Sequence, residues 1–366
     1  MTTQEIQFFH RGAVVSVNDA EPTRTVLDWL REDAHCTGTK EGCNEGDCGA
    51  CTVVIGELAQ DGDTSAVGGL KLQTVNACIQ FLPTLHGKAL FTVEDLKTQC
   101  ATNSSAAKPG EPAQQPLHPV QQAMVECHGS QCGFCTPGFV MSLWSTYEHH
   151  QARGTVPTRQ QLADELSGNL CRCTGYRPIL DAGQRMFDLA QVRLDTQPVV
   201  VALQQLSRSA TFSYATAAPS PGVRAPVLHS PRSLQELAAL RLEQPKATLL
   251  AGSTDIGLWV NKQLRDLGDI IYVGDVDELK TIQEANGELY IGAAASLEAA
   301  WSALASRVSA LTDVWLRFAS PPIRNAGTMG GNVANGSPIG DSPPILMAMD
   351  ADIELRQGSR VRRMPL

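Results

Sequence analysis

The stretch that decides the fold is EGCNEGDCGAC, residues 41–51, which places three cysteines in one short glycine-rich loop. Four residues separate Cys43 from Cys48, two separate Cys48 from Cys51, and Cys78 follows after 26 intervening residues. This three-plus-one spacing is typical of plant-type [2Fe–2S] sites, in which one loop supplies three thiolates. A zinc site or a structural cysteine-rich turn is the weaker interpretation, because zinc ligands usually come as two short pairs.

The glycines of this loop suit an anionic cluster. Gly42, Gly46 and Gly49 let the backbone turn sharply enough to point N–H groups at the cysteine sulfurs. The β-branched run Thr52-Val53-Val54-Ile55 follows directly and predicts a strand. The loop is therefore expected at the edge of a small sheet.

A second cysteine group consists of Cys132 and Cys135 in CGFC and Cys171 and Cys173 in CRC, with 35 residues between the two pairs. Spacing alone leaves a four-cysteine zinc site and a second iron–sulfur cluster both open. The single residue inside the second pair suits zinc less well, and a neighbouring cluster favours a second redox centre. The remaining cysteines, Cys36, Cys100 and Cys127, are expected to be bystander thiols.

Composition narrows the class of protein. The 366 residues suggest two or three domains, and 43% hydrophobic with 18% charged residues describes a folded chain. The net charge is −9 and the sequence contains no basic stripe, which argues against a nucleic-acid partner. No apolar run reaches the roughly 20 residues of a membrane span. The N-terminus MTTQEIQFFHRG lacks a secretory pattern. Most of the 11 cysteines fall in tight groups, and in a reducing compartment such thiols point to metal or redox chemistry. We therefore expect a soluble, cytoplasmic protein.

The periodicity of apolar residues divides the chain into three parts. Residues 1–91 read as a β-grasp, ferredoxin-like unit, with strands at 6–9, 14–17 and 52–55 and a helix at 25–33. Residues 92–200 read as a helical domain that begins with a polar linker, 98–119, and includes a capping box formed by Thr158 and Gln161. A linker at 201–224 then leads to an α+β domain, 225–366, with strands at 247–251, 270–273 and 289–291 and a helix at 296–304.

Three long motifs carry a family resemblance. TGTKEGCNEGDCGACTV at 37–53, HGSQCGFCTPG at 128–138 and GNLCRCTGYRPI at 168–179 together resemble the iron–sulfur portion of the xanthine dehydrogenase family. The resemblance implies a multidomain α+β chain: a ferredoxin-like [2Fe–2S] domain, an all-α [2Fe–2S] domain, and an FAD-binding domain of the molybdopterin dehydrogenase type. The implied cluster ligands are Cys43, Cys48, Cys51 and Cys78 for one cluster and Cys132, Cys135, Cys171 and Cys173 for the other.

Two further loops fit the same resemblance. LLAGSTD (249–255) is a strand ending in a glycine turn before a predicted helix, 256–262, an arrangement suited to holding a pyrophosphate. NAGTMGGN (325–332) is a second glycine-rich turn; either turn alone is weak evidence, and GxGxxG is absent, so a Rossmann fold is not expected. The pair resembles the family's FAD site, which implies contacts from Leu249, Leu250, Ala251, Gly252, Ser253, Thr254, Asp255, Phe318, Ala326, Gly327, Thr328, Met329, Gly330, Gly331, Asn332 and Asp341.

The function implied by the resemblance is electron transfer. A molybdenum-binding large subunit, in a heterodimer-based oligomer, would oxidise hypoxanthine or xanthine to urate, and electrons would pass through two [2Fe–2S] clusters to FAD and NAD⁺. Gln131 matches a position that reaches the molybdopterin of that partner. Family members continue beyond RRMPL at 362–366, so we expect a truncated FAD domain and place no catalytic residue on this chain. The alternatives are the same role in an aldehyde or N-heterocycle hydroxylase, or a non-catalytic zinc-stabilised interaction module.

Overall fold

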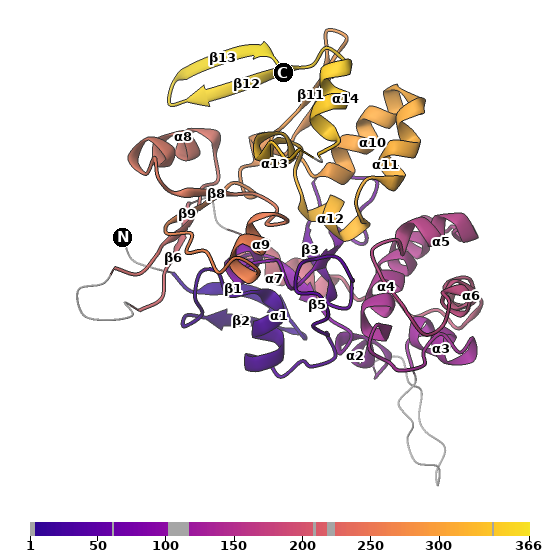
Figure 1. Cartoon of the computed structure of the whole chain (residues 1–366). Helices are drawn as coiled ribbons and strands as arrows, with labels where there is room; N and C mark the ends of the chain where they lie inside the picture. Colours follow the sequence, from indigo (N-terminus) through magenta and orange to yellow (C-terminus); the bar gives the residue numbers. More distant parts are fainter. Residues whose placement is uncertain (1–3, 61, 102–116, 208–209, 218–223, 339) are drawn as a thin grey trace.

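Strand β3 (Thr52–Leu58) begins one residue after Cys51 and lies inside a five-stranded sheet of order β2-β1-β5-β3-β4 (Figure 1). The hairpin of β1 (Ile6–His10) and β2 (Ala13–Val17) turns through two residues with positive φ. Strand β1 also pairs in parallel with β5 (Ala89–Phe91), while β3 pairs antiparallel with β4 (Leu70–Asn76). This mixed sheet with a helix packed on it, α1 (Val26–Asp28) continued by a π-helical turn, is the expected β-grasp unit.

The structure is a computed structural model that describes residues 4–60, 62–101, 117–207, 210–217, 224–338 and 340–366. Successive residues of β3 point to opposite faces of the sheet, so each face builds a different core. Val53 and Ile55 join a core shared with the third part of the chain. Val54 joins a core shared with the helical part. The first sheet is therefore the centre of the molecule, with a domain packed on either face.

The helical domain packs on this sheet through its longest helix. Helix α4 (Thr136–Arg153) contacts β3 and β4, and its fully buried Trp144 lies 5.4 Å, between ring centroids, from Phe91. The expected capping box forms at α5, where the side chains of Thr158 and Gln161 bond each other's backbone. The other helices of this domain are α2 (Asp95–Ala101), α3 (Pro119–Glu126), α5 (Arg159–Glu165) and α6 (Arg177–Arg185).

The third domain is a mixed α+β unit, as expected. Its four-stranded sheet has the order β6-β7-β9-β8, with β6 (Phe212–Tyr214), β7 (Leu228–Ser230), β8 (Thr248–Leu250) and β9 (Ile270–Tyr272). Two hairpins, β10 (Ile282–Ala285) with β11 (Glu288–Ile291) and β12 (Asp352–Gln357) with β13 (Arg360–Pro365), accompany it. The helices are α8 (Leu234–Glu243), α9 (Ile256–Asn261), α10 (Leu297–Arg307), α11 (Thr312–Arg317), α12 (Pro321–Ala326), α13 (Met329–Asn335) and α14 (Ser342–Ala348).

The expected linker 201–224 differs from the observed structure. Within 201–224, helix α7 (Gln197–Leu206) packs on β1 and β3, and β6 joins the third sheet. The Tyr214 hydroxyl donates to the carbonyl of Ala20, 2.5 Å away, so this segment is fixed to the first domain. Of the expected linker 98–119, residues 102–116 lie outside the described residues. No helix in the described ranges is both long and apolar enough to cross a membrane.

Candidate cofactor sites

The first cysteine loop is shaped by close backbone contacts. The N–H groups of Asp47 and Cys48 both donate to the Cys43 sulfur, each at 3.3 Å, which is the arrangement the glycines were expected to allow. Gly46 and Gly49 have φ values of 81° and 68°, a region that glycine enters without strain. A β-carbon at Gly49 would lie 2.1 Å from the carbonyl oxygen of Gly168, so no larger residue fits there.

The four thiols of the first group are linked by pairwise contacts. Cys43 contacts Cys78 and Cys48, and Cys51 also contacts Cys78. Contact with Cys78, with help from backbone N–H groups, lowers the pKa of Cys43 to about 4 despite its partial burial. Contact with Cys78 also lowers the pKa of Cys51, whereas contact with Cys43 and Cys51 raises the pKa of Cys78. Cys43 and Cys51 are therefore the thiols of this group that favour the thiolate form.

The second group also comes together, in pairs. Cys135 contacts Cys171, and Cys132 contacts Cys173. Among the described residues, no three or more His, Cys, Asp or Glu side chains converge as one metal ion would require. Four thiols meeting as two pairs fit a binuclear cluster, in which each iron takes two thiolates. The donor set therefore suits [2Fe–2S] at both groups.

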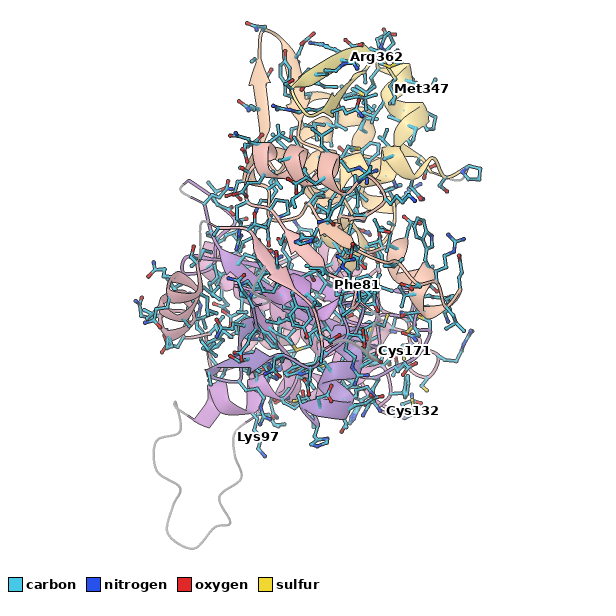
Figure 2. All side chains as sticks on the ribbon, turned by 90° about the vertical axis from the view of Figure 1, so that its left-hand side faces the viewer. Phe81, Lys97, Cys132, Cys171, Met347 and Arg362 are labelled. Carbon is cyan, nitrogen blue, oxygen red and sulfur yellow. The ribbon has the colours of Figure 1, made fainter. Side chains whose placement is uncertain are left out.

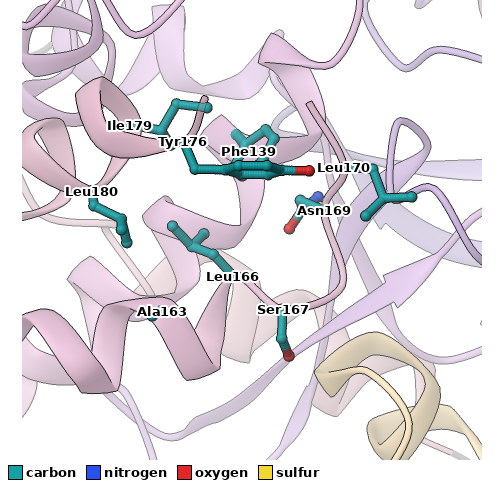
Figure 3. A pocket seen from close by; sticks show the side chains of 9 residues that line it. All are labelled: Phe139, Ala163, Leu166, Ser167, Asn169, Leu170, Tyr176, Ile179 and Leu180. Atoms are coloured by element: carbon teal, nitrogen blue, oxygen red, sulfur yellow. The ribbon is translucent and has the colours of Figure 1, made fainter. Parts of the chain in front are cut away.

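The second group lies at the surface. Cys132 and Cys173 are exposed, and Figure 2 shows Cys132 and Cys171 at the opposite end of the molecule from Met347 and Arg362. An apolar pocket of about 260 Å³ opens beside this group (Figure 3). Its lining includes Leu170 and Tyr176, and the Tyr176 hydroxyl accepts a hydrogen bond of 3.1 Å from the Cys171 N–H.

The two cysteine loops touch each other. The N–H of Leu170 donates to the carbonyl oxygen of Cys48 at 3.0 Å. The buried side chain of Asn169 donates to the Gly49 carbonyl at 3.0 Å and accepts from the Ser142 hydroxyl at 2.7 Å. The segment that carries Cys171 is thus anchored on the loop that carries the first group.

The two glycine-rich turns of the third domain also meet. Leu249 and Leu250 end β8, and the next five residues, Ala251–Asp255, form the turn into α9. A β-carbon built at Gly252 would lie 1.8 Å from the carbonyl oxygen of Ala326, so the turns are in direct contact. Gly327 and Thr328 join α12 to α13, whose first residues are Met329, Gly330, Gly331 and Asn332.

The hydrogen-bond donors of the two turns are used differently. In the second turn, residues 325–332, the N–H groups of Gly327, Gly330 and Gly331 donate to protein oxygens. In the first turn, the N–H groups of Gly252, Ser253 and Thr254 have no acceptor in the described part of the protein. The Ser253 hydroxyl, in a residue only 4% exposed, likewise lacks a partner there, as does the Asn332 side-chain oxygen. The free donors therefore gather on the first turn, and they suit the anionic pyrophosphate of a dinucleotide.

Three residues predicted to contact a cofactor are Phe318, Asp341 and Gln131. Phe318 is partly buried and packs against Trp301, with ring centroids 5.7 Å apart. Asp341 is exposed at the start of α14, and Gln131 is exposed beside Cys132. Their assignment to FAD and to a partner's molybdopterin remains a prediction.

Helix α9 connects the first glycine-rich turn, residues 251–255, which we call the flavin turn, to the first cysteine loop. The Asn261 side chain donates to the Cys78 carbonyl at 2.7 Å, and the Lys262 ammonium donates to the Cys43 carbonyl at 2.6 Å. A β-carbon at Gly257 would lie 2.9 Å from the Ile79 carbonyl oxygen, so the helix lies against the backbone next to Cys78. Asn169, Asn261 and Lys262 were not among the predicted site residues. The only signal for them was their position inside or next to the predicted motifs.

Family models match about four fifths of the chain in three parts. Residues 8–82 match a 2Fe-2S iron–sulfur cluster binding domain, residues 105–184 match a [2Fe-2S] binding domain, and residues 222–366 match the FAD binding domain in molybdopterin dehydrogenase. The order of the three matches is the order expected from the motifs. The chain therefore carries two [2Fe–2S]-binding domains and an FAD-binding domain.

The similar xanthine dehydrogenase and aldehyde oxidase are much longer than this chain. A xanthine dehydrogenase of Drosophila pseudoobscura pseudoobscura is 32% identical over 96% of this chain, which spans 28% of that relative's length. Aldehyde oxidase 2 of Rattus norvegicus is 29% identical over the whole chain, which spans 29% of its length. A crystal structure of quinoline 2-oxidoreductase from Pseudomonas putida 86 is 29% identical in sequence. The match covers 56% of this chain and 98% of that chain, with a TM-score of 0.36. The domain matches and the relatives together show that the chain belongs to the molybdenum hydroxylase family, as its iron–sulfur and FAD-binding part.

Proposed function

We propose that this chain is the electron-transfer part of a xanthine dehydrogenase. Electrons released when hypoxanthine or xanthine is hydroxylated at a molybdenum centre on a partner subunit would pass singly through the two [2Fe–2S] sites to FAD, and then as a pair to NAD⁺. The bound cofactors supply the redox chemistry, and the chain's residues hold them in sequence and tune their potentials.

The observation that carries this proposal is the chain of contacts from the second cysteine group to the flavin turn. Leu170, next to Cys171, is hydrogen-bonded to Cys48, and Cys78 is hydrogen-bonded to Asn261 at the end of the helix that follows the flavin turn. The first group therefore lies between the second group and the flavin turn. Consecutive placement of three candidate cofactor sites, joined by hydrogen bonds, suits stepwise electron transfer better than a purely structural role for the cysteines.

The surface position of the second group supports a partner that delivers electrons there. Cys132 and Cys173 are exposed, so a molybdenum-binding subunit could approach this group closely. We assign Gln131, exposed next to Cys132, to contact with the partner's molybdopterin. No general acid or base for the hydroxylation is placed on this chain, because that chemistry belongs to the partner.

The specific substrate is a second question. The relatives include a xanthine dehydrogenase and an aldehyde oxidase, so an aldehyde hydroxylase that uses the same electron route is the second candidate. We favour the purine because the identity to the xanthine dehydrogenase, 32%, is higher than the identity to the aldehyde oxidases of Rattus norvegicus, 29%, and Cavia porcellus, 31%. Substrate choice would lie on the partner in either case.

The test uses the complex of this chain with its molybdenum-binding partner. With hypoxanthine or xanthine, we expect urate and NADH to form in step. Cys173→Ser should abolish NADH formation while a dye that takes electrons directly from the molybdenum centre still supports urate formation. Wild-type NADH formation by Cys173→Ser would refute the electron route. Turnover of an aldehyde such as benzaldehyde without turnover of xanthine would support the second candidate instead.

A further inference from the structure

A lysine of the third domain contacts the loop of the first cysteine group. The Lys262 ammonium lies 2.6 Å from the carbonyl oxygen of Cys43 and 3.7 Å from a carboxylate oxygen of Glu45. Lys262 follows the last residue of α9 and so is fixed by the helix that begins at the flavin turn. Its side chain is 42% exposed, so part of the lysine is shielded from solvent by this contact.

The loop itself carries an excess of negative charge. Glu41, Glu45 and Asp47 lie within seven consecutive residues and are all exposed. The loop's own cation, Lys40, donates to the carbonyl of Thr37 at 2.7 Å. Negative charge close to an iron–sulfur cluster disfavours the added electron and lowers its reduction potential. A cation supplied from another domain therefore opposes the effect of the loop's own carboxylates.

We infer that Lys262 is a positioning residue that raises the reduction potential of the first [2Fe–2S] site, an inference that rests on the proposed function. Reduction adds one negative charge to the site, and the nearby ammonium stabilises that charge. Because the pair with Glu45 is partly exposed, solvent screens the effect. We expect loss of the ammonium to lower the reduction equilibrium constant about three- to tenfold, which is about 28 to 59 mV for one electron.

The consequence concerns the last step before the flavin. The first group lies between the second group and the flavin turn, so its potential determines how readily electrons move on toward FAD. A higher potential at this site favours its reduction by the second group. Lys262 would thereby link correct docking of the flavin domain to the direction of electron flow.

The experiment is an anaerobic redox titration of the full-length protein with both clusters, followed by electron paramagnetic resonance. Lys262→Met should lower the midpoint potential of the first cluster, and Lys262→Arg should keep it within a few millivolts of the wild type. Glu45→Gln should raise it, and the double variant should lie close to the wild type because two opposite charges are removed together. Lys246→Met, which removes an exposed lysine of the same domain, should change neither cluster.

The second cluster in each sample is an internal reference and should keep its potential in all variants. An unchanged first-cluster potential in Lys262→Met, or equal shifts in the Met and Arg variants, would overturn the inference and leave the electron route intact. If Lys262→Met fails to assemble the cluster, Glu45→Gln decides: its potential must rise, and a constant or lower value would overturn the inference. Absence of both cluster signals from the wild type would refute the proposed function as well.

Discussion

The N–H of Leu170 donates a hydrogen bond of 3.0 Å to the carbonyl oxygen of Cys48, and this bond joins the two cysteine groups through the backbone. Leu170 directly precedes Cys171, so the hydrogen bond is made by the residue next to a thiol of the second group. The same approach requires Gly49, whose added β-carbon would collide with the carbonyl of Gly168. Glycine at this position therefore lets the helical domain rest directly on the ferredoxin-like loop.

Asn169 should hold this interface together. Its side chain is 3% exposed and bonds Gly49, Thr52 and Ser142, so Asn169→Ala leaves buried polar groups without partners. We expect the free energy of unfolding to fall by about 2–4 kcal/mol. Asn169→Asp should also destabilise the protein. The new side chain keeps an acceptor for the Ser142 hydroxyl but loses the N–H groups that donate to Gly49 and Thr52. Urea denaturation measures the effect, with the exposed Gln204→Ala as a control expected to change it by less than about 0.5 kcal/mol. A loss in Asn169→Ala as small as the control's would contradict the role.

Removal of one thiol should affect only its own group. Cys171→Ser should reduce the iron content from about four to about two per chain, since each [2Fe–2S] site holds two irons. Cys127→Ser should keep the full content, because Cys127 lies outside both groups of contacting thiols. Iron and sulfide analysis of anaerobically purified protein measures both variants. Equal iron losses in the two variants would show that the second group is not the ligand set.

Ser253→Ala should have opposite effects on stability and on flavin binding. The Ser253 hydroxyl is buried without a described partner, so its removal should leave the free energy of unfolding of the flavin-free protein unchanged or higher by about 1 kcal/mol. If the hydroxyl contacts FAD, the affinity for FAD should fall about tenfold, or about 1.4 kcal/mol. Thermal denaturation and a flavin fluorescence titration measure the two effects, with exposed Ser207→Ala as the control. Unchanged FAD affinity would remove Ser253 from the site.

Glu148 should make the helical domain less stable as the pH rises. The side chain is fully buried in α4, and burial raises its pKa to about 7, although Oε1 accepts from the Leu194 N–H at 3.0 Å and Arg193 lies nearby. A carboxyl whose folded-state pKa is raised contributes full stability below its unfolded pKa, about 4.5, and loses it as the pH approaches 7.

Glu148→Gln removes this titration and keeps the shape of the side chain. The free energy of unfolding of the variant should rise relative to that of the wild type between pH 5 and 7. The difference should reach about 1–3 kcal/mol and stay constant above pH 7. Hydrogen exchange of α4 amides at several pH values measures the difference. A difference that does not grow over this window would show that Glu148 is not the titrating group.

Local sequence signals predicted much of the fold. The Thr158–Gln161 capping box, the helix after the flavin turn and the strand after Cys51 follow rules that act within a few residues, and the structure has all three. Spacing also placed Cys43, Cys48 and Cys51 in one loop and the second group in two short pairs. These features depend on residues that are close together in the sequence.

Contacts between domains were not predictable in this way. Strand β6, Phe212–Tyr214, lies in a stretch that was expected to be a linker. Its aromatic rings pack against the first domain, where the His86 ring stacks on Phe212 with the ring centroids 3.8 Å apart. Lys262 and Asn261 likewise gain their importance only when α9 meets the cysteine loop. No periodicity marks residues whose partners lie about two hundred positions away.

The most direct test of the central claim is the amount of iron, zinc and acid-labile sulfide per chain in anaerobically purified protein. Two [2Fe–2S] sites predict about four irons and four sulfides with no zinc. Two of each, with zinc, would leave one cluster and make the second cysteine group a zinc site. Zinc without sulfide would contradict the electron-transfer account and favour a zinc-stabilised interaction module.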